Sequence, residues 1–134
     1  MSPLADNVRA FLDEVRFATI ATTNRDGSPH LTALWYALRG DTIVLNTGTT
    51  SKKVRNLKRD NRASVCVVDA GQARHVTLEG TVRLDDSRVM EDLTELASRY
   101  AGAQAGPGIA ANIAKNPHVS LVLNVDRVKT FGKI

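Results

Sequence analysis

The chain has 134 residues, of which 43% are hydrophobic and 24% are charged, and this predicts one globular domain over residues 1–134. The single cysteine excludes an internal disulfide framework. We expect a cytoplasmic protein without a membrane segment, because the sequence shows neither a signal peptide nor an apolar run of about 18 residues. The formal net charge of +4 is compatible with nucleic acid, a membrane surface or a phosphorylated small molecule, so the placement of the charges must decide between them.

The first part of the chain predicts a helix followed by three strands. Apolar residues recur at helical spacing over residues 3–14, and Val15 continues their pattern. Small and β-branched residues over 16–23 and an extended apolar run over 30–38 are joined by turn residues, which is typical of a β-hairpin. Residues 42–47 then predict a third strand, antiparallel to the second.

The second part of the chain predicts three more strands and two helices. Buried or alternating β patterns cover residues 62–69, 75–84 and 119–125. A helical repeat covers 86–100, and a brief helix follows a glycine-rich loop and ends near Lys115. Six strands with few peripheral helices predict a mainly β (α+β) fold, namely a six-stranded antiparallel barrel that is closed or nearly closed.

The densest cluster of charge follows the third predicted strand. Between residues 52 and 62, six basic residues accompany one acidic residue, Asp60. If Thr50 or Ser51 caps a helix here, the 100° step places Val54 and Leu57 against the barrel. The opposite side of that helix would carry Lys52, Arg55, Asn56 and Arg59.

The turn that leads into this basic helix has the chemistry of an anion site. It combines the hydroxyl groups of Thr49, Thr50 and Ser51 with the unpaired N–H groups of a helix start and two lysines, Lys52 and Lys53. A phosphate there would accept several charge-assisted hydrogen bonds. The alternative is an ordinary solvated basic helix, and the placement of the hydroxyl groups between a strand end and a helix start favours the phosphate site.

Nucleic acid is the other ligand that such a charge cluster can bind. Single-strand binders combine a basic groove with aromatic side chains on which bases stack. Only 4% of this chain is aromatic, and Trp35 and Tyr36 form its only adjacent aromatic pair. We therefore expect no nucleic-acid partner.

The other polar residues indicate neither a catalytic group nor a metal site. His30, His75 and His118 lack metal-ligand spacing, and no nucleophile-elbow sequence is present. Cys66 lies among apolar residues, as a small buried hydrophobe does. Trp35 and Tyr36 are expected to point to opposite faces of their strand, so at most one of them lines a given pocket.

Six segments in this order resemble the pyridoxamine 5′-phosphate oxidase-like split β-barrel flavoproteins, and most of all their actinobacterial branch that uses the deazaflavin coenzyme F420. The most specific segment is the run Lys-Lys-x-Arg-Asn-Leu-x-Arg-Asp that begins at Lys52. The resemblance covers residues 5–84 well and the final strand more loosely. The segments are residues 17–22, 26–30, 34–36, 43–47, 51–60 and 62–65.

The resemblance implies a split barrel, a homodimer and a cofactor in each of two grooves at the subunit interface. It places the cofactor phosphate near the strand, loop and helix segment that matches Thr47 to Asn56, with Asn56 supporting the loop. The phosphate would be held by Thr50, Ser51, Lys52 and Lys53, and the ring would be bordered by Pro29, Leu34, Trp35 and Tyr36. The arginine-rich substrate-binding end of true pyridoxamine-phosphate oxidases is missing from residues 129–134, which argues against vitamin B6 oxidation.

Two cofactors fit this resemblance. Coenzyme F420 carries a phospholactyl-polyglutamate tail, whereas FMN has only its phosphate, and the surplus cations Arg55, Lys58 and Arg59 favour F420. The cofactor supplies the redox chemistry, so no catalytic triad is expected. The predicted function is an F420-dependent reductase that passes a hydride from the reduced deazaflavin to a small unsaturated or conjugated acceptor. The alternatives are an FMN-binding oxidase or reductase, and a cofactor-binding protein without turnover.

Overall fold

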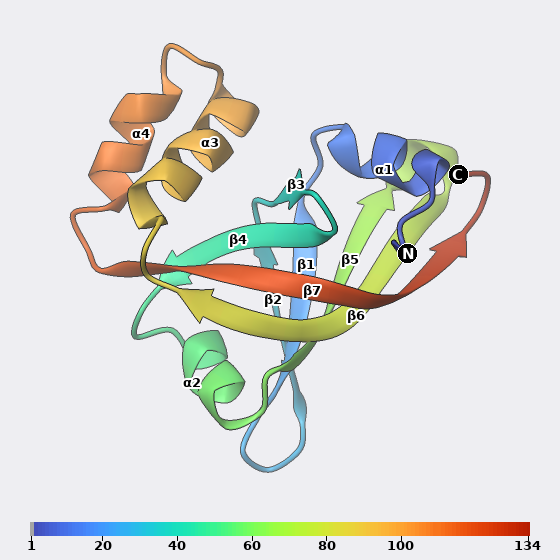
Figure 1. The fold of residues 1–134 in the computed structure, drawn as a ribbon, viewed down its shortest axis with the longest axis horizontal. Helices are drawn as coiled ribbons and strands as arrows, with labels where there is room; N and C mark the ends of the chain where they lie inside the picture. The colour runs from blue at the N-terminus through green and yellow to red at the C-terminus, as the bar shows by residue number, and fades with distance from the viewer. Residues whose placement is uncertain (1) are drawn as a thin grey trace.

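The computed structural model describes residues 2–134, whose main element is a seven-stranded antiparallel sheet (Figure 1). The strand order is β2-β1-β5-β6-β7-β4-β3, so β2 and β3 form the two edges and the sheet does not close. The strands are β1 Ala18–Thr23, β2 Pro29–Leu34, β3 Ala37–Arg39, β4 Thr42–Gly48, β5 Arg62–Asp69, β6 Arg74–Asp85 and β7 His118–Phe131. The helices are α1 Asp6–Asp13, α2 Lys52–Arg59, α3 Val89–Ala101 and α4 Gly106–Ile113, with a short 3₁₀ turn at Ala70–Gln72.

The mainly β, antiparallel fold is confirmed, with one more strand than the sequence predicts. The extended run 30–38 is divided at Trp35 and Tyr36, so that β2 pairs with β1 and β3 pairs with β4. At Tyr36 the backbone N–H donates to the hydroxyl of Tyr100 at 3.0 Å instead of to a neighbouring strand. The Tyr36 hydroxyl donates to the carbonyl of Leu12 at 2.7 Å, and burial raises the pKa of Tyr36 to about 12.

The core is formed by the inward faces of the strands, with α1 packed against them. Alternation along β4 and β7 buries Ile43 and Leu45 of β4 beside Leu121 and Leu123 of β7. Helix α1 adds Val8, Phe11 and Leu12 to this cluster. Val15 does not join it: the helix ends at Asp13, and the Val15 side chain is 53% exposed, which corrects the prediction of a continuous apolar face.

Strand β7 connects the two parts of the sheet. Its first half pairs with β4, and along most of its length it also pairs with β6. Figure 1 shows β6 and β7 as two long curved strands that cross in front of β1 and β5. β7 extends to Phe131, six residues beyond the predicted end at Val125, because β6 offers a partner as far as His75.

The pairing of β6 with β7 shifts between Glu79, opposite Arg127, and Gly80, opposite Val125, which leaves Asp126 as the extra residue of a β-bulge on β7. A Cβ atom at Gly80 would lie 1.8 Å from the carbonyl oxygen of Asn124 on β7. The position therefore requires glycine because of backbone contact.

Helices α3 and α4 form a pair at one end of the sheet (Figure 1), with their own apolar cluster of Leu93, Ala97 and Ala110. A buried charge anchors this pair to the sheet. The Asp92 carboxylate of α3 is 1% exposed, and it accepts hydrogen bonds from Arg39 of β3 and Ser120 of β7, each at 2.6 Å. A buried carboxylate is tolerated only when it is paired in this way, so these bonds fix where α3 lies.

We expect Gly80→Ala to lower the free energy of unfolding by about 3 kcal/mol, because β7 must move away from the added methyl group. Urea denaturation measures the loss. The matched control is Gly108→Ala on α4, where a Cβ meets no atom within 4 Å. Equal stability of the two variants would contradict the assignment of a backbone clash.

The turn before α3 is stabilised by an ionised carboxylate. The Asp85 carboxylate accepts hydrogen bonds from the backbone N–H and hydroxyl of Ser87 and from Arg83, and these bonds lower the pKa of Asp85 to about 2. Since the folded-state pKa lies below the unfolded value of about 4, the stabilisation is complete above that value and is lost as the pH falls towards 2.

We therefore expect Asp85→Asn to be less stable than the parent protein at pH 7, with a difference that shrinks between pH 4 and 2. Thermal unfolding across this pH range measures the effect. Asp86→Asn, at the adjacent exposed residue, serves as the control. A difference that does not depend on pH would show that the charge of Asp85 is not involved.

Candidate functional site

A cavity of about 360 Å³ lies between the α3–α4 pair and the ends of β2 and β4. Leu34 and Trp35 form one wall, and the helices contribute Leu93, Leu96 and Ile113. The polar side chains of the wall are Asn46 and Thr47 of β4 and His118 of β7, and none of the residues that line the cavity is acidic, lysine or arginine. The cavity therefore suits a planar, largely apolar group.

Trp35 and Tyr36 point in different directions, as predicted. Trp35 lines the cavity and stacks on Tyr100 of α3, with ring centroids 5.1 Å apart and an angle of 11° between the rings. Tyr36 is fully buried in the core. Of the four residues predicted to border a ring, Leu34 and Trp35 therefore lie at this cavity and Tyr36 does not.

The strand end at Thr47 is joined to α2 by a buried lysine. The Nζ atom of Lys53 donates to Thr47 Oγ1 at 3.0 Å, and Thr47 Oγ1 lies 3.4 Å from Ser51 Oγ. Only 7% of Lys53 is exposed, and burial lowers its pKa. Lys53 thus lies beneath the turn, whereas Lys52 is exposed on its surface.

Asn56 connects α2 to the turn between β1 and β2. Its side-chain amide donates to Thr22 Oγ1 at 3.1 Å and to Asn24 Oδ1 at 3.0 Å. The prediction that Asn56 lies on the outer face of α2 with Lys52 is wrong, because Asn56 is 3% exposed on the same side as Val54 and Leu57. Polar partners on β1 compensate for its burial.

The first backbone N–H groups of α2 are not capped by a side chain. Ser51 is the N-cap residue, as predicted, but its side chain makes no capping hydrogen bond. The first N–H groups of a helix have no partners within the helix, so this turn can bind an anion. Thr50 is exposed at the same turn, and its carbonyl accepts a hydrogen bond from Arg55 at 2.9 Å.

A basic hollow of about 460 Å³ lies on the outer side of α2. It is lined by Asn56 and by five cationic residues, Arg25, Lys52, Arg55, Lys58 and Arg59. Arg59 also donates to the carbonyl of Thr23, which ties the hollow to β1. The concentration of positive charge favours a ligand with several negative charges.

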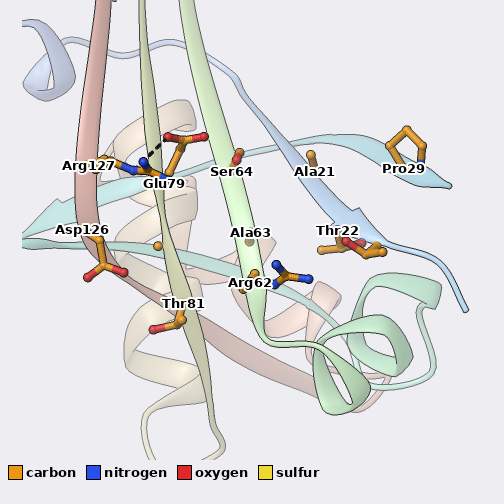
Figure 2. A pocket seen from close by; sticks show the side chains of 12 residues that line it. Ala21, Thr22, Pro29, Arg62, Ala63, Ser64, Glu79, Thr81, Asp126 and Arg127 are labelled. Atoms are coloured by element: carbon orange, nitrogen blue, oxygen red, sulfur yellow. Dashed lines mark ion pairs between the residues drawn. The ribbon is translucent and has the colours of Figure 1, made fainter. Parts of the chain in front are cut away.

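A third depression, of about 510 Å³, lies on the outer face of the sheet, and Figure 2 shows its lining residues. Pro29, predicted to border the ring, lies at the opposite end of this groove from Glu79 and Arg127. The Glu79 Oε1 atom lies 3.6 Å from Arg127 Nε and 3.5 Å from Lys129 Nζ, so it is ion-paired with two cations although it makes no hydrogen bond. The structure thus separates Pro29 from Leu34 and Trp35.

The described residues contain no group of three or more His, Cys, Asp or Glu side chains that could hold a metal ion. Within residues 2–134, no helix combines the length and apolar character needed to cross a bilayer.

Sequence reasoning missed two polar residues of the cavity, Asn46 and His118. Asn46 lies between two buried residues of β4, so its side chain points to the opposite face of the strand, which α3 covers. This alternation is visible in the sequence. His118 was considered only as a metal ligand. Its place beside Gly48 depends on the pairing of β4 with β7, between segments about 70 residues apart, which local sequence does not reveal.

Comparison with known proteins identifies the family. A profile of the family described as "Pyridoxamine 5'-phosphate oxidase" matches residues 4–132. The "F420H(2)-dependent biliverdin reductase" of Mycobacterium tuberculosis is 32% identical over 108 residues, which cover 78% of this chain and 77% of that protein.

Solved structures agree with this match. The conserved hypothetical protein Rv2991 of Mycobacterium tuberculosis has a TM-score of 0.79 and 28% identity, over 98% of this chain and 88% of that one. A pyridoxamine 5′-phosphate oxidase-related, FMN-binding protein of Nostoc punctiforme has a TM-score of 0.64 and 21% identity, over 87% and 74% of the two chains, and supports the fold alone. This chain therefore belongs to the pyridoxamine 5′-phosphate oxidase family, as its motifs predicted, and to the flavin- and deazaflavin-dependent oxidoreductases within that fold.

Proposed function

We propose that this protein is an F420-dependent reductase that reduces a small conjugated acceptor in the cytoplasm. The reduced deazaflavin would supply the hydride, and FMN is the alternative cofactor. The family and the relationship to an F420-dependent reductase support a flavin-like cofactor. The choice of F420 and of a small acceptor is our inference from the site.

The observation that carries the proposal is the order of three features along residues 34–59. An uncharged cavity beside Trp35 ends at Thr47 and Gly48, the exposed hydroxyl-bearing turn follows, and the basic hollow begins at Lys52. A ring, a phosphate and an anionic tail occur in the same order in F420. FMN would use the first two features and leave the hollow without a ligand.

The residues of this chain have separate tasks in this proposal. Trp35 and Leu34 border the ring and exclude water, which protects a hydride donor. Lys52 and the α2 N–H groups bind the phosphate, while Lys53 holds Thr47 and the turn in place from below. Asn46 offers a buried oxygen without a partner at the cavity, so a ring with polar edges fits this wall.

We expect purified protein to bind F420 more tightly than FMN in parallel fluorescence titrations. Lys52→Ala should weaken both ligands by about tenfold, because it removes a charge-assisted hydrogen bond to the phosphate. Lys58→Glu should weaken long-tailed F420 by about fivefold and leave FMN nearly unchanged, and added salt should reduce that difference.

The matched control is Lys133→Glu, an exposed lysine outside the hollow, which should change neither affinity. If Lys58→Glu and Lys133→Glu weaken the binding of F420 equally, the tail of F420 does not bind in the hollow. A yellow preparation that releases FMN would establish the alternative cofactor.

Turnover is tested by following the consumption of reduced F420 in the presence of conjugated acceptors, including biliverdin because of the related reductase. Binding of the cofactor without its consumption would indicate a carrier.

We also propose that two copies of the chain associate through the outer face of the sheet. In-register neighbours across this face are Leu31, Ala21, Ser64 and Glu79, a row of small or exposed residues ending in a carboxylate that faces two cations. Leu31, Val68 and Phe131 are each more than half exposed. Exposed apolar side chains beside a shallow groove suit a second copy that covers them.

We expect Ser64→Arg to convert a dimer into a monomer of 14.5 kDa, because a long charged side chain would separate the two faces. Light scattering after size-exclusion chromatography measures the mass. Asn112→Arg on the exposed side of α4 is the control and should remain dimeric. A parent protein that is monomeric at high concentration would exclude this interface.

A further inference from the structure

The side-chain amide of Asn46 is held in one orientation by a chain of hydrogen bonds. Its Nδ2 group lies 3.3 Å from Ser120 Oγ, and Ser120 Oγ lies 2.6 Å from the Asp92 carboxylate. Arg39 binds the same carboxylate at 2.6 Å. The chain runs from the α3–α4 anchor to the wall of the cavity.

The direction of each hydrogen bond follows from chemistry. An ionised carboxylate only accepts, so the single hydroxyl proton of Ser120 must be donated to Asp92. Ser120 Oγ can then only accept from Asn46, which must present its NH₂ group. The Asn46 Oδ1 atom is consequently turned away from Ser120, and the structure gives this buried atom no hydrogen-bond partner.

An unpaired buried carbonyl oxygen costs about 1–3 kcal/mol, so its presence needs an explanation. The α2 turn and the basic hollow supply cations, but no lysine or arginine lines this cavity. The partner that suits this oxygen is therefore a neutral hydrogen-bond donor, an N–H or O–H group, carried by a ligand.

Resting on the proposed function, we propose that Asn46 Oδ1 accepts a hydrogen bond from the N–H group of a planar conjugated ring, and that it selects ligands carrying that group. Such an N–H lies between two carbonyl groups in the pyrimidine ring of flavins and deazaflavins, and a lactam acceptor carries an N–H beside one carbonyl group. Both sources share the same chemistry, and the experiment below separates them.

The position of the α3–α4 pair makes this contact feasible. Oδ1 is covered from water in the unliganded cavity, so an entering ring must displace neighbouring side chains. Leu93 and Ile113 cover the cavity from helices that have a hydrophobic cluster separate from the main core. These side chains can therefore move without disturbing the main core.

The first arm of the test compares lumiflavin with 3-methyllumiflavin, in which a methyl group replaces the ring N–H proton. The parent protein should bind lumiflavin about tenfold more tightly, and Asn46→Leu should reduce this ratio to near one. Asn124→Leu, on the exposed part of β7 outside the cavity, should keep the parent ratio.

The second arm measures KM for a conjugated lactam and its N-methyl derivative with reduced F420. A preference for N–H in the first arm assigns Asn46 to the cofactor ring, and a preference confined to the second assigns it to the acceptor. Absence of a preference in both arms, or its persistence in Asn46→Leu, would overturn the assignment.

The melting temperature of the Asn46→Leu variant distinguishes a ligand-binding role of Asn46 from a structural one. Asn46→Leu removes a buried atom without a partner and also the long 3.3 Å hydrogen bond to Ser120, so the two effects offset and the unliganded variant should melt near the temperature of the parent. A lower melting temperature with the ligand preference intact would show that Asn46 is only structural. Failure of the parent to bind F420 or FMN would refute the proposed function itself, whereas binding without an N–H preference would refute this assignment alone.

Discussion

The buried carboxylate of Asp92 is the interaction on which the architecture of the site depends. Its bonds to Arg39 and Ser120 join α3 to strands β3 and β7, which are far apart in the sequence. A charge in this position requires all its partners, so the helices can pack in only one place on the sheet. The same carboxylate fixes the Ser120 hydroxyl, and through it the amide of Asn46, so that one ion pair shapes both the roof and the polar wall of the cavity.

The two adjacent lysines at the start of α2 have different surroundings despite similar sequence positions. Lys53 is buried against Thr47, where desolvation lowers its pKa, and it stabilises the turn from within. Lys52 is exposed among the cations of the outer hollow. The family resemblance predicts that both lysines bind the phosphate. In the structure, Lys53 supports the turn from below, whereas Lys52 lies on the surface, where it can bind an anion.

The strands, the basic helix and the family were predictable because they depend on local patterns. Alternation along β4 and the capping position at Ser51 need no information from elsewhere in the chain. The break at Tyr36 was not predictable, because its N–H group bonds to Tyr100, 64 positions away. The inward turn of Asn56 likewise depends on Thr22 and Asn24, and helical periodicity alone assigned it to the wrong face.

The dual pairing of β7 has a consequence for the order in which the molecule can form. Strands β3 and β4 are attached to the rest of the sheet through β7, which follows both β4 and β6 in the chain. Until β7 has left the ribosome, β4 and β6 both expose open edges that can pair with other chains. Protection of these two edges is therefore acquired only once residues 118–131 have emerged, and a chain that stops before residue 118 would keep both edges open.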